Sequence, residues 1–211
     1  MLRGTMGVPV SHSLRLLLLV AILAQAGEAS AQSDEALHRN ALLSLIHSAN
    51  GFPTRKQLLR TGAVAETNRI LAEIVGDKHV ADYLRLNAIR ALEYFPTKRS
   101  EEVMMSLLYE RRVRTAYRKA CMRSLARAFG VKMYFEILPF LRDESPVVRE
   151  GAAMALAEID DNRVQGILAN HLANEPDLSV RIAIEQALKM VDTRDRAPQP
   201  TPRPGLPIHE E

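Results

Sequence analysis

The sequence has 211 residues, contains no tryptophan, and is only 5% aromatic. Single-stranded nucleic acids are usually held by aromatic side chains interleaved with basic ones, so this composition argues against a nucleic-acid partner. Without residues 1–31, which are treated below as a leader, the formal net charge falls from +3 to about +2, which is too small to indicate nucleic acid by itself. Cys121 is the one cysteine, so no disulfide can form within this sequence.

The residues that commonly build catalytic or metal sites are not arranged in a recognisable catalytic or metal-binding motif. The histidines are not arranged in the H-E-x-x-H spacing of a zinc site, and the one His-Glu dipeptide is His209-Glu210, near the end of the sequence. Cys121 falls at an apolar position of its predicted helix, whereas a reactive cysteine needs exposure and a base. We therefore expect no enzymatic activity, no cofactor and no metal site.

The N-terminus has the features of a secretory leader. A weakly basic lead precedes the unbroken apolar run Leu16–Ala24, and Ala29-Ser30-Ala31 then fits the small-x-small rule for cleavage. An uncleaved membrane anchor is the alternative, but the run is shorter than the roughly 20 residues that span a bilayer. The sequence predicts a signal peptide over residues 1–31 with cleavage after Ala31, a periplasmic or secreted protein, and no stable membrane insertion after cleavage.

The rest of the chain repeats one pattern four times. The pattern is an Arg, a small residue two positions later and a Leu seven positions later, and successive Arg residues are 33, 31 and 32 positions apart. Its occurrences are Arg85-Asn87-Leu92, Arg118-Ala120-Leu125, Arg149-Gly151-Leu156 and Arg181-Ala183-Leu188. A period of this length indicates a solenoid of paired helices, and solenoids commonly present surface to partners.

Apolar periodicity places two helices in each repeat. The first helices are predicted over residues 64–75, 100–110, 132–142 and 162–173, and the second helices over 81–95, 115–129, 146–159 and 178–191. Ser100 is predicted to cap one first helix, and Pro146 to begin a second helix.

The flanking segments lack the repeated pattern. Residues 32–63 are predicted to form an N-terminal helical cap, in which Thr54 begins a short helix with Gln57 in capping-box position. Residues 193–211 are rich in proline and are predicted to form a disordered tail.

The third repeat resembles a HEAT repeat in Ile137–Asp143 followed by Val147–Leu156, including the proline in its first helix and the Asp six residues before the Arg. This resemblance covers roughly residues 64–191 and, together with the predicted leader, suggests an exported bacterial member of that family. It implies an all-α fold, a right-handed α-solenoid (an α-α superhelix) of about four HEAT-like helix pairs. It also implies that the repeated Arg pairs with acids between repeats. The Asp of the third repeat is Asp143, and the equivalent positions of the other repeats hold His79, Arg112 and Glu175. The series of acid–Arg pairs between repeats, the acid–Arg ladder, is therefore expected to be incomplete.

The second repeat carries a basic row, since Lys119, Arg123 and Arg127 are spaced four residues apart and share one face of the predicted helix. In HEAT-like arrays the second helices line the concave surface. The candidate partner-binding residues on that surface are Arg90, Tyr94, Lys119, Arg123, Arg127, Met154 and Glu158. The same row could be an ordinary solvated face.

The sequence thus predicts a non-catalytic protein-binding or scaffold module that acts outside the cytoplasm. Two alternatives are an accessory subunit of an envelope enzyme or assembly, and an anionic-ligand binder that uses the basic face of the second repeat. The identity of the protein partner is not specified by the sequence.

Overall fold

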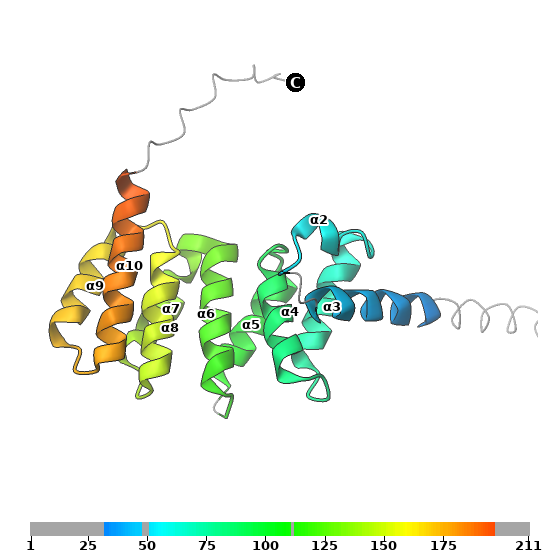
Figure 1. Ribbon diagram of the computed structural model, residues 1–211, viewed down its shortest axis with the longest axis horizontal. Helices are drawn as coiled ribbons and strands as arrows, with labels where there is room; N and C mark the ends of the chain where they lie inside the picture. The colour runs from blue at the N-terminus through cyan, green and yellow to red at the C-terminus, as the bar shows by residue number, and fades with distance from the viewer. Residues whose placement is uncertain (1–31, 48–50, 111, 197–211) are drawn as a thin grey trace, which may run out of the picture. The chain divides into compact units, whose positions relative to one another are not determined.

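The computed structural model describes residues 32–47, 51–110 and 112–196, and these residues contain helices and no strand. The predicted signal peptide lies outside the described residues, as does the part of the predicted tail beyond residue 196. The chain divides into two compact units, Met1–Ala63 and Val64–Glu211 (Figure 1).

The N-terminal unit contains a helix over residues 32–47 and the short α2, Arg55–Leu58. Its buried apolar side chains are Leu42, Ile46 and Leu58. The predicted capping box is confirmed: the Thr54 side chain accepts a hydrogen bond from the Gln57 amide (3.3 Å), and the Gln57 side chain accepts one from the Thr54 amide (2.8 Å).

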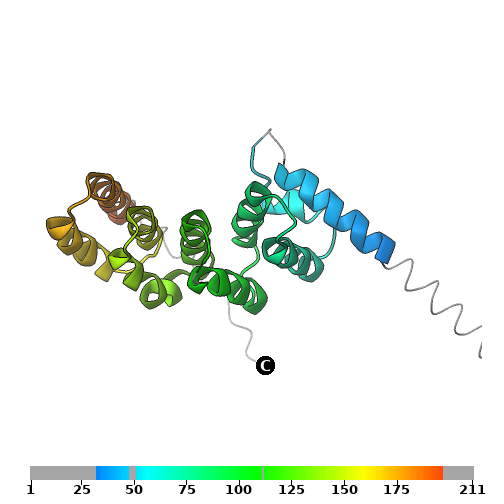
Figure 2. The same cartoon turned by 90° about the horizontal axis from the view of Figure 1, so that it is seen from below.

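The second unit is an α-solenoid, as the periodicity predicted. Figure 2 shows its helices in two rows, with the second helix of every pair on the inner side of the curve that this unit forms. The pairs are α3 (Val64–Gly76) with α4 (Asp82–Leu92), α5 (Lys98–Tyr109) with α6 (Thr115–Phe129), the segment Gly130–Arg142 with α8 (Pro146–Ala157), and α9 (Arg163–Asn174) with α10 (Leu178–Arg196). Pro146 is in the first turn of α8, where its missing N–H costs no hydrogen bond, as predicted.

The repeated apolar positions build a continuous core between the two rows. The Leu of the pattern is fully buried in the first three repeats and half-buried as Leu188 in the fourth. The residue one place before that Leu is small in every repeat and buried in all four: Ala91, Ser124, Ala155 and Ala187. Gly151 serves the same close packing, because a Cβ there would lie 2.9 Å from Lys119 Cγ on α6.

The cap of α5 differs from the prediction. The helix begins at Lys98, and Thr97 is its N-cap, with a side chain that accepts from the Ser100 amide (3.2 Å). Ser100 is the third residue of the helix rather than its cap. Its buried hydroxyl contacts the Thr97 amide (2.8 Å) and the Phe95 carbonyl (2.7 Å), so both residues satisfy backbone groups at this turn.

The first helix of the third repeat is broken, although one helix was predicted over residues 132–142. It consists of η1 (Gly130–Met133), α7 (Tyr134–Ile137) and η2 (Leu138–Arg142), of which η1 and η2 are 3₁₀ turns. Gly130 ends α6 with a φ of 57°, a conformation that favours glycine. Pro139 cannot donate the backbone hydrogen bond that an α-helix needs at its position, which favours the tighter turn.

Helix α10 continues to Arg196, so residues 193–196 are helical rather than part of the predicted tail. The Thr193 hydroxyl donates to the Lys189 carbonyl (2.7 Å). Arg194 donates to the carbonyls of Ala157 (3.1 Å) and Ile159 (2.9 Å), which lie at the end of α8. These contacts satisfy free carbonyls of α8 and extend α10 beyond its apolar stripe.

Candidate partner surface

The repeated Arg residues tie successive repeats together, most closely between the third and fourth. Arg149 donates to both carboxylate oxygens of Glu175, at 3.0 and 2.7 Å, and also to the Asp143 carbonyl at the end of η2 (2.9 Å). Both side chains are well buried, with 13% and 2% of their surfaces exposed. The hydrogen bonds from Arg149 hold the pKa of Glu175 below its usual value, despite the opposing effect of burial.

The junction between the second and third repeats has the same arrangement in a looser form. Arg118 donates to the Glu110 carbonyl at the end of α5 (3.2 Å), and its guanidinium lies 3.7 Å from the Asp143 carboxylate. The sequence predicted an incomplete series of acid–Arg pairs, and the structure has two of them. Asp143 pairs with Arg118, and Glu175 pairs with Arg149 in the same way. A carboxylate on the longer Glu side chain fills the same role as the Asp.

The junction between the first and second repeats places its charges the other way round. Arg112 occupies the position of the acid, and Arg85 instead donates to the Val75 carbonyl (2.9 Å) and lies over the Tyr117 ring (4.7 Å). The acid is Asp82 of the first repeat, which pairs with Arg114 and accepts from the Tyr117 hydroxyl (2.7 Å).

This contact shifts the pKa values of both Asp82 and Tyr117. The hydrogen bond from Tyr117 is the largest influence that lowers the pKa of Asp82. Burial, followed by the hydrogen bond to Asp82, raises the pKa of Tyr117 to about 12.

The predicted basic row of α6 lies on the exposed side of the second helices, which we call the second-helix face. It is formed by the exposed and half-buried residues Lys119, Arg123, Arg127, Glu150, Met154, Glu158, Ile182 and Gln186. Its basic side chains pair with acids of the neighbouring second helices. The pairs are Lys119 with Glu150 (3.3 Å), Arg123 with Glu158 (3.3 Å), and Arg127 with Glu158 (2.7 Å) and Glu93 (3.5 Å).

These pairs neutralise much of the positive charge that the sequence placed on this row. Glu93, which sequence reasoning missed, also accepts a hydrogen bond from the Ser124 hydroxyl (2.9 Å). Arg90 is exposed near the C-terminal end of α4, and Tyr94 is half-buried just beyond that helix. The remaining predicted residues lie next to the basic row: Met154 is half-buried on α8, and Glu158 is half-buried directly after that helix.

An apolar hollow of about 330 Å³ opens on the second-helix face among α6, α8 and α10. Met154, Ile182 and Ala183 supply its apolar lining. The polar and charged side chains that also line it are Lys119, Arg123, Glu150, Ser179 and Gln186. Ile182 keeps 47% of its surface exposed, so it presents apolar surface at this hollow. Ile182 had not been predicted as a site residue, although its position in the row of Lys119 and Glu150 could have identified it.

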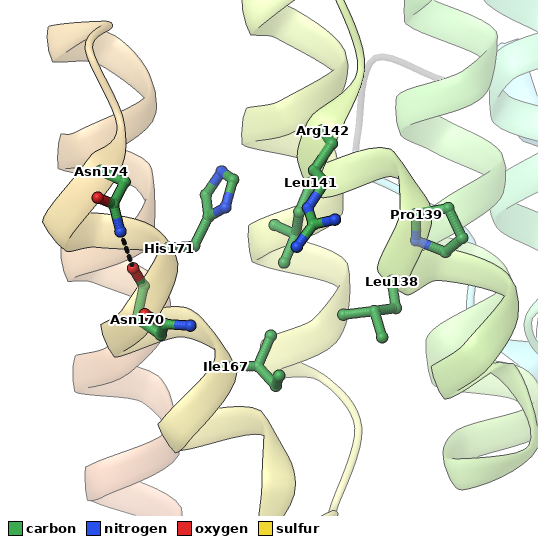
Figure 3. A pocket seen from close by; sticks show the side chains of 8 residues that line it. All are labelled: Leu138, Pro139, Leu141, Arg142, Ile167, Asn170, His171 and Asn174. Carbon is green, nitrogen blue, oxygen red and sulfur yellow. Dashed lines mark hydrogen bonds between the residues drawn. The ribbon is translucent and has the colours of Figure 1, made fainter.

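A larger hollow of about 610 Å³ lies in the other row of helices, between η2 and α9 (Figure 3). Sequence reasoning missed this pocket, because the break in the first helix of the third repeat was not predicted. Its lining residues are Leu138, Pro139, Leu141, Arg142, Ile167, Asn170, His171 and Asn174.

Comparison with known proteins identifies the architecture of the C-terminal part of the solenoid. Residues 116–189 match the family model of HEAT repeats. This match supports a HEAT-repeat family for the chain, and it spans the second-helix face from α6 to α10. No curated protein matches the sequence.

Residues 32–47, 51–110 and 112–196 contain no cluster of three or more His, Cys, Asp or Glu side chains placed to hold a metal ion. Cys121 is buried, and burial raises the pKa of its thiol far above the ordinary value, which suits a packing residue rather than a nucleophile. None of the helices in these ranges is both long enough and apolar enough to span a bilayer.

Proposed function

We propose that the protein is a non-catalytic scaffold that binds another protein through the second-helix face. HEAT repeats generally mediate protein–protein interaction, and the matching residues include this face. The observation that carries the proposal is the apolar hollow around Met154 and Ile182, which is bordered by the charged residues of α6. An apolar centre with a charged rim is the usual anatomy of a protein interface.

The charges of the rim favour a protein over a small anion as the ligand. Lys119, Arg123 and Arg127 already have carboxylate partners, so an anion would have to compete with Glu150 and Glu158 for them. A protein surface can instead cover the apolar hollow and leave these ion pairs at the rim.

Photo-crosslinking in the native host tests this surface. We expect a photoreactive residue in place of Ile182 to give a discrete protein adduct, and Met154→Glu to abolish that adduct. The matched control is Val131, which is similarly exposed (49%, against 47% for Ile182) but lies in the row of first helices. An adduct at both positions, or at Val131 alone, would place the interaction elsewhere.

The site of action is a second part of the proposal. The apolar run Leu16–Ala24 and the motif Ala29-Ser30-Ala31 support export, with loss of residues 1–31 and action in the periplasm or beyond. An envelope assembly would then supply the partner, and the protein could serve as its accessory subunit. Intact-mass analysis of the protein from the envelope of the native host should give the mass of residues 32–211, and a mass that includes the leader would refute the export proposal.

A further inference from the structure

The pocket in Figure 3 belongs to a groove between two first helices. Segment η2 forms one wall and α9 forms the other. Leu138, Leu141 and Ile167 make its apolar lining, whereas Arg142 and Asn174 carry polar groups at one end. Because the segment from 130 to 142 is broken into short turns, it does not fill the space beside α9 as a regular helix would.

The opposite end of the groove is aromatic. Phe135 and Arg163 precede the lining residues Leu138 and Ile167 by three and four positions, so they extend the same two walls by one turn. The Arg163 guanidinium lies 4.2 Å from the centroid of the Tyr134 ring and 5.0 Å from that of Phe135. Arg163 is itself held by Asp161 (2.6 Å), yet 67% of the surface of Phe135 stays exposed. A fixed, exposed ring of this kind suits contact with a proline-rich chain.

Helix α10 ends close to this aromatic end. Arg194, in its last turn, bonds to the carbonyls of Ala157 and Ile159 and lies 3.3 Å from the Asp160 carboxylate. Those residues lead directly into Asp161 and Arg163. The described part of α10 therefore ends beside the turn that leads to Arg163.

We propose that the segment 197–211 of this same chain binds in the groove, entering over Phe135 and ending near Arg142. Prolines at every second position from 198 to 204 match the aromatic end. Leu206 and Ile208 match the apolar lining, and Glu210 with Glu211 match the cationic Arg142. At ~3.1 Å per residue these residues reach roughly 45 Å, whereas α9, at ~1.5 Å per residue, spans only about 18 Å.

Disulfide trapping in the full chain tests the proposal. Asn174→Cys places a thiol at the polar end of the groove, and His209→Cys places one on the segment. We expect this pair to form an intramolecular disulfide about tenfold faster than a control pair of Gln186→Cys with His209→Cys, since binding raises the local concentration of one thiol near the other. Gln186 is exposed on the second-helix face and is nearer to Arg196 along α10. The buried Cys121 does not compete for oxidation.

Two further substitutions separate binding from random encounter. Arg142→Glu and Phe135→Ala should each lower the rate of the groove pair towards that of the control, while Arg142→Lys should largely preserve it. Both wild-type residues have exposed side chains, and circular dichroism verifies the fold of each variant. Equal rates for the two pairs, or no effect of Arg142→Glu, would overturn the proposal. Disulfides formed chiefly between two molecules would also overturn it, because the occupant would then be a second copy.

Discussion

Arg149 and Arg85 hold the same position in their repeats, but their junctions are built differently. Arg149 meets a buried acid of the following repeat, Glu175, in a two-pronged ion pair. Arg85 faces a repeat with Arg112 in that place, and it lies over the Tyr117 ring instead. Helices α4 and α6 also pack less extensively than α8 and α10. The same position of the repeated pattern thus forms a buried ion pair at one junction and a contact with an aromatic ring at the other.

The difference shows how a solenoid can form a junction without an acid at the position that Glu175 occupies in the fourth repeat. The negative charge at the first junction has moved to Asp82, which reaches forward to Arg114 and Tyr117 of the next repeat. Asp82 and Arg114 keep 46% and 71% of their side-chain surfaces exposed, so water and salt screen this pair. The junction between the third and fourth repeats should therefore resist unfolding more strongly than the junction between the first and second repeats.

The largest effect is expected from Glu175→Ala. This change leaves the Arg149 charge buried without its partner, a loss that typically costs on the order of 3–5 kcal/mol. Chemical denaturation measures the free energy of unfolding. A cost below about 1 kcal/mol, the range of surface pairs, would remove the distinction between the two junctions.

Acidification should weaken the ion pair between Arg149 and Glu175. The pKa of Glu175 is lower in the folded state than the ordinary value of 4.5, so the pair stabilises the fold above that value. This contribution is lost as the pH falls through the folded-state pKa. We expect the stability difference between wild type and Glu175→Gln to shrink below pH 4.5, and a difference that grows on acidification would contradict the assignment.

Leu156→Ala should cost about 2–5 kcal/mol, the range for truncation of a buried leucine. Leu156 is fully buried in the third repeat, whereas Leu188, its equivalent in the fourth, is half-buried. We therefore expect a smaller loss for Leu188→Ala. Thermal melts of the two variants compare an internal repeat with the terminal one, and the reverse order would show that the register of the second helices is wrong.

The period and the core of this solenoid could be predicted from the sequence, because both follow from local spacing. An apolar residue every three to four positions defines a buried stripe wherever the helix lies in space. Helix α6 begins and ends at the predicted residues 115 and 129, and Leu92, Leu125 and Leu156 are buried as expected. Pro146 and the Thr54–Gln57 box were equally local signals.

The charge pattern of the second-helix face could not be predicted in the same way. Lys119 and Glu150 are 31 positions apart, and Arg123 and Glu158 are 35 apart, so their pairing depends on how two helices pack. Spacing placed the basic residues on one face but could not show that acids of α8 would neutralise them. The groove beside α9 was missed for a related reason, since the break at Gly130 and Pro139 depends on turn geometry.

Arg194→Ala should cost about 1.5–3 kcal/mol, the range for hydrogen bonds made by a charged group. The side chain closes the end of α8 through the carbonyls of Ala157 and Ile159. Arg181→Ala is the matched control, since Arg181 is an exposed arginine of the same helix. Equal denaturation midpoints for Arg194→Ala and wild type would mean that the Arg194 hydrogen bonds do not stabilise the end of α8.

Asp82→Asn should change stability least, because its ion pair is exposed and salt screens it. The phenol of Tyr117 reports the contact more directly. Its pKa of about 12 should fall in Asp82→Asn but stay above 10, since burial, the larger cause of the shift, is retained. Ultraviolet titration, with Tyr117→Phe used to assign the signal, measures this change. Tyr109 also has a pKa raised to about 12, by burial and by its hydrogen bond to Glu136, and should not respond. An unchanged Tyr117 titration would mean that Asp82 does not hold the first junction.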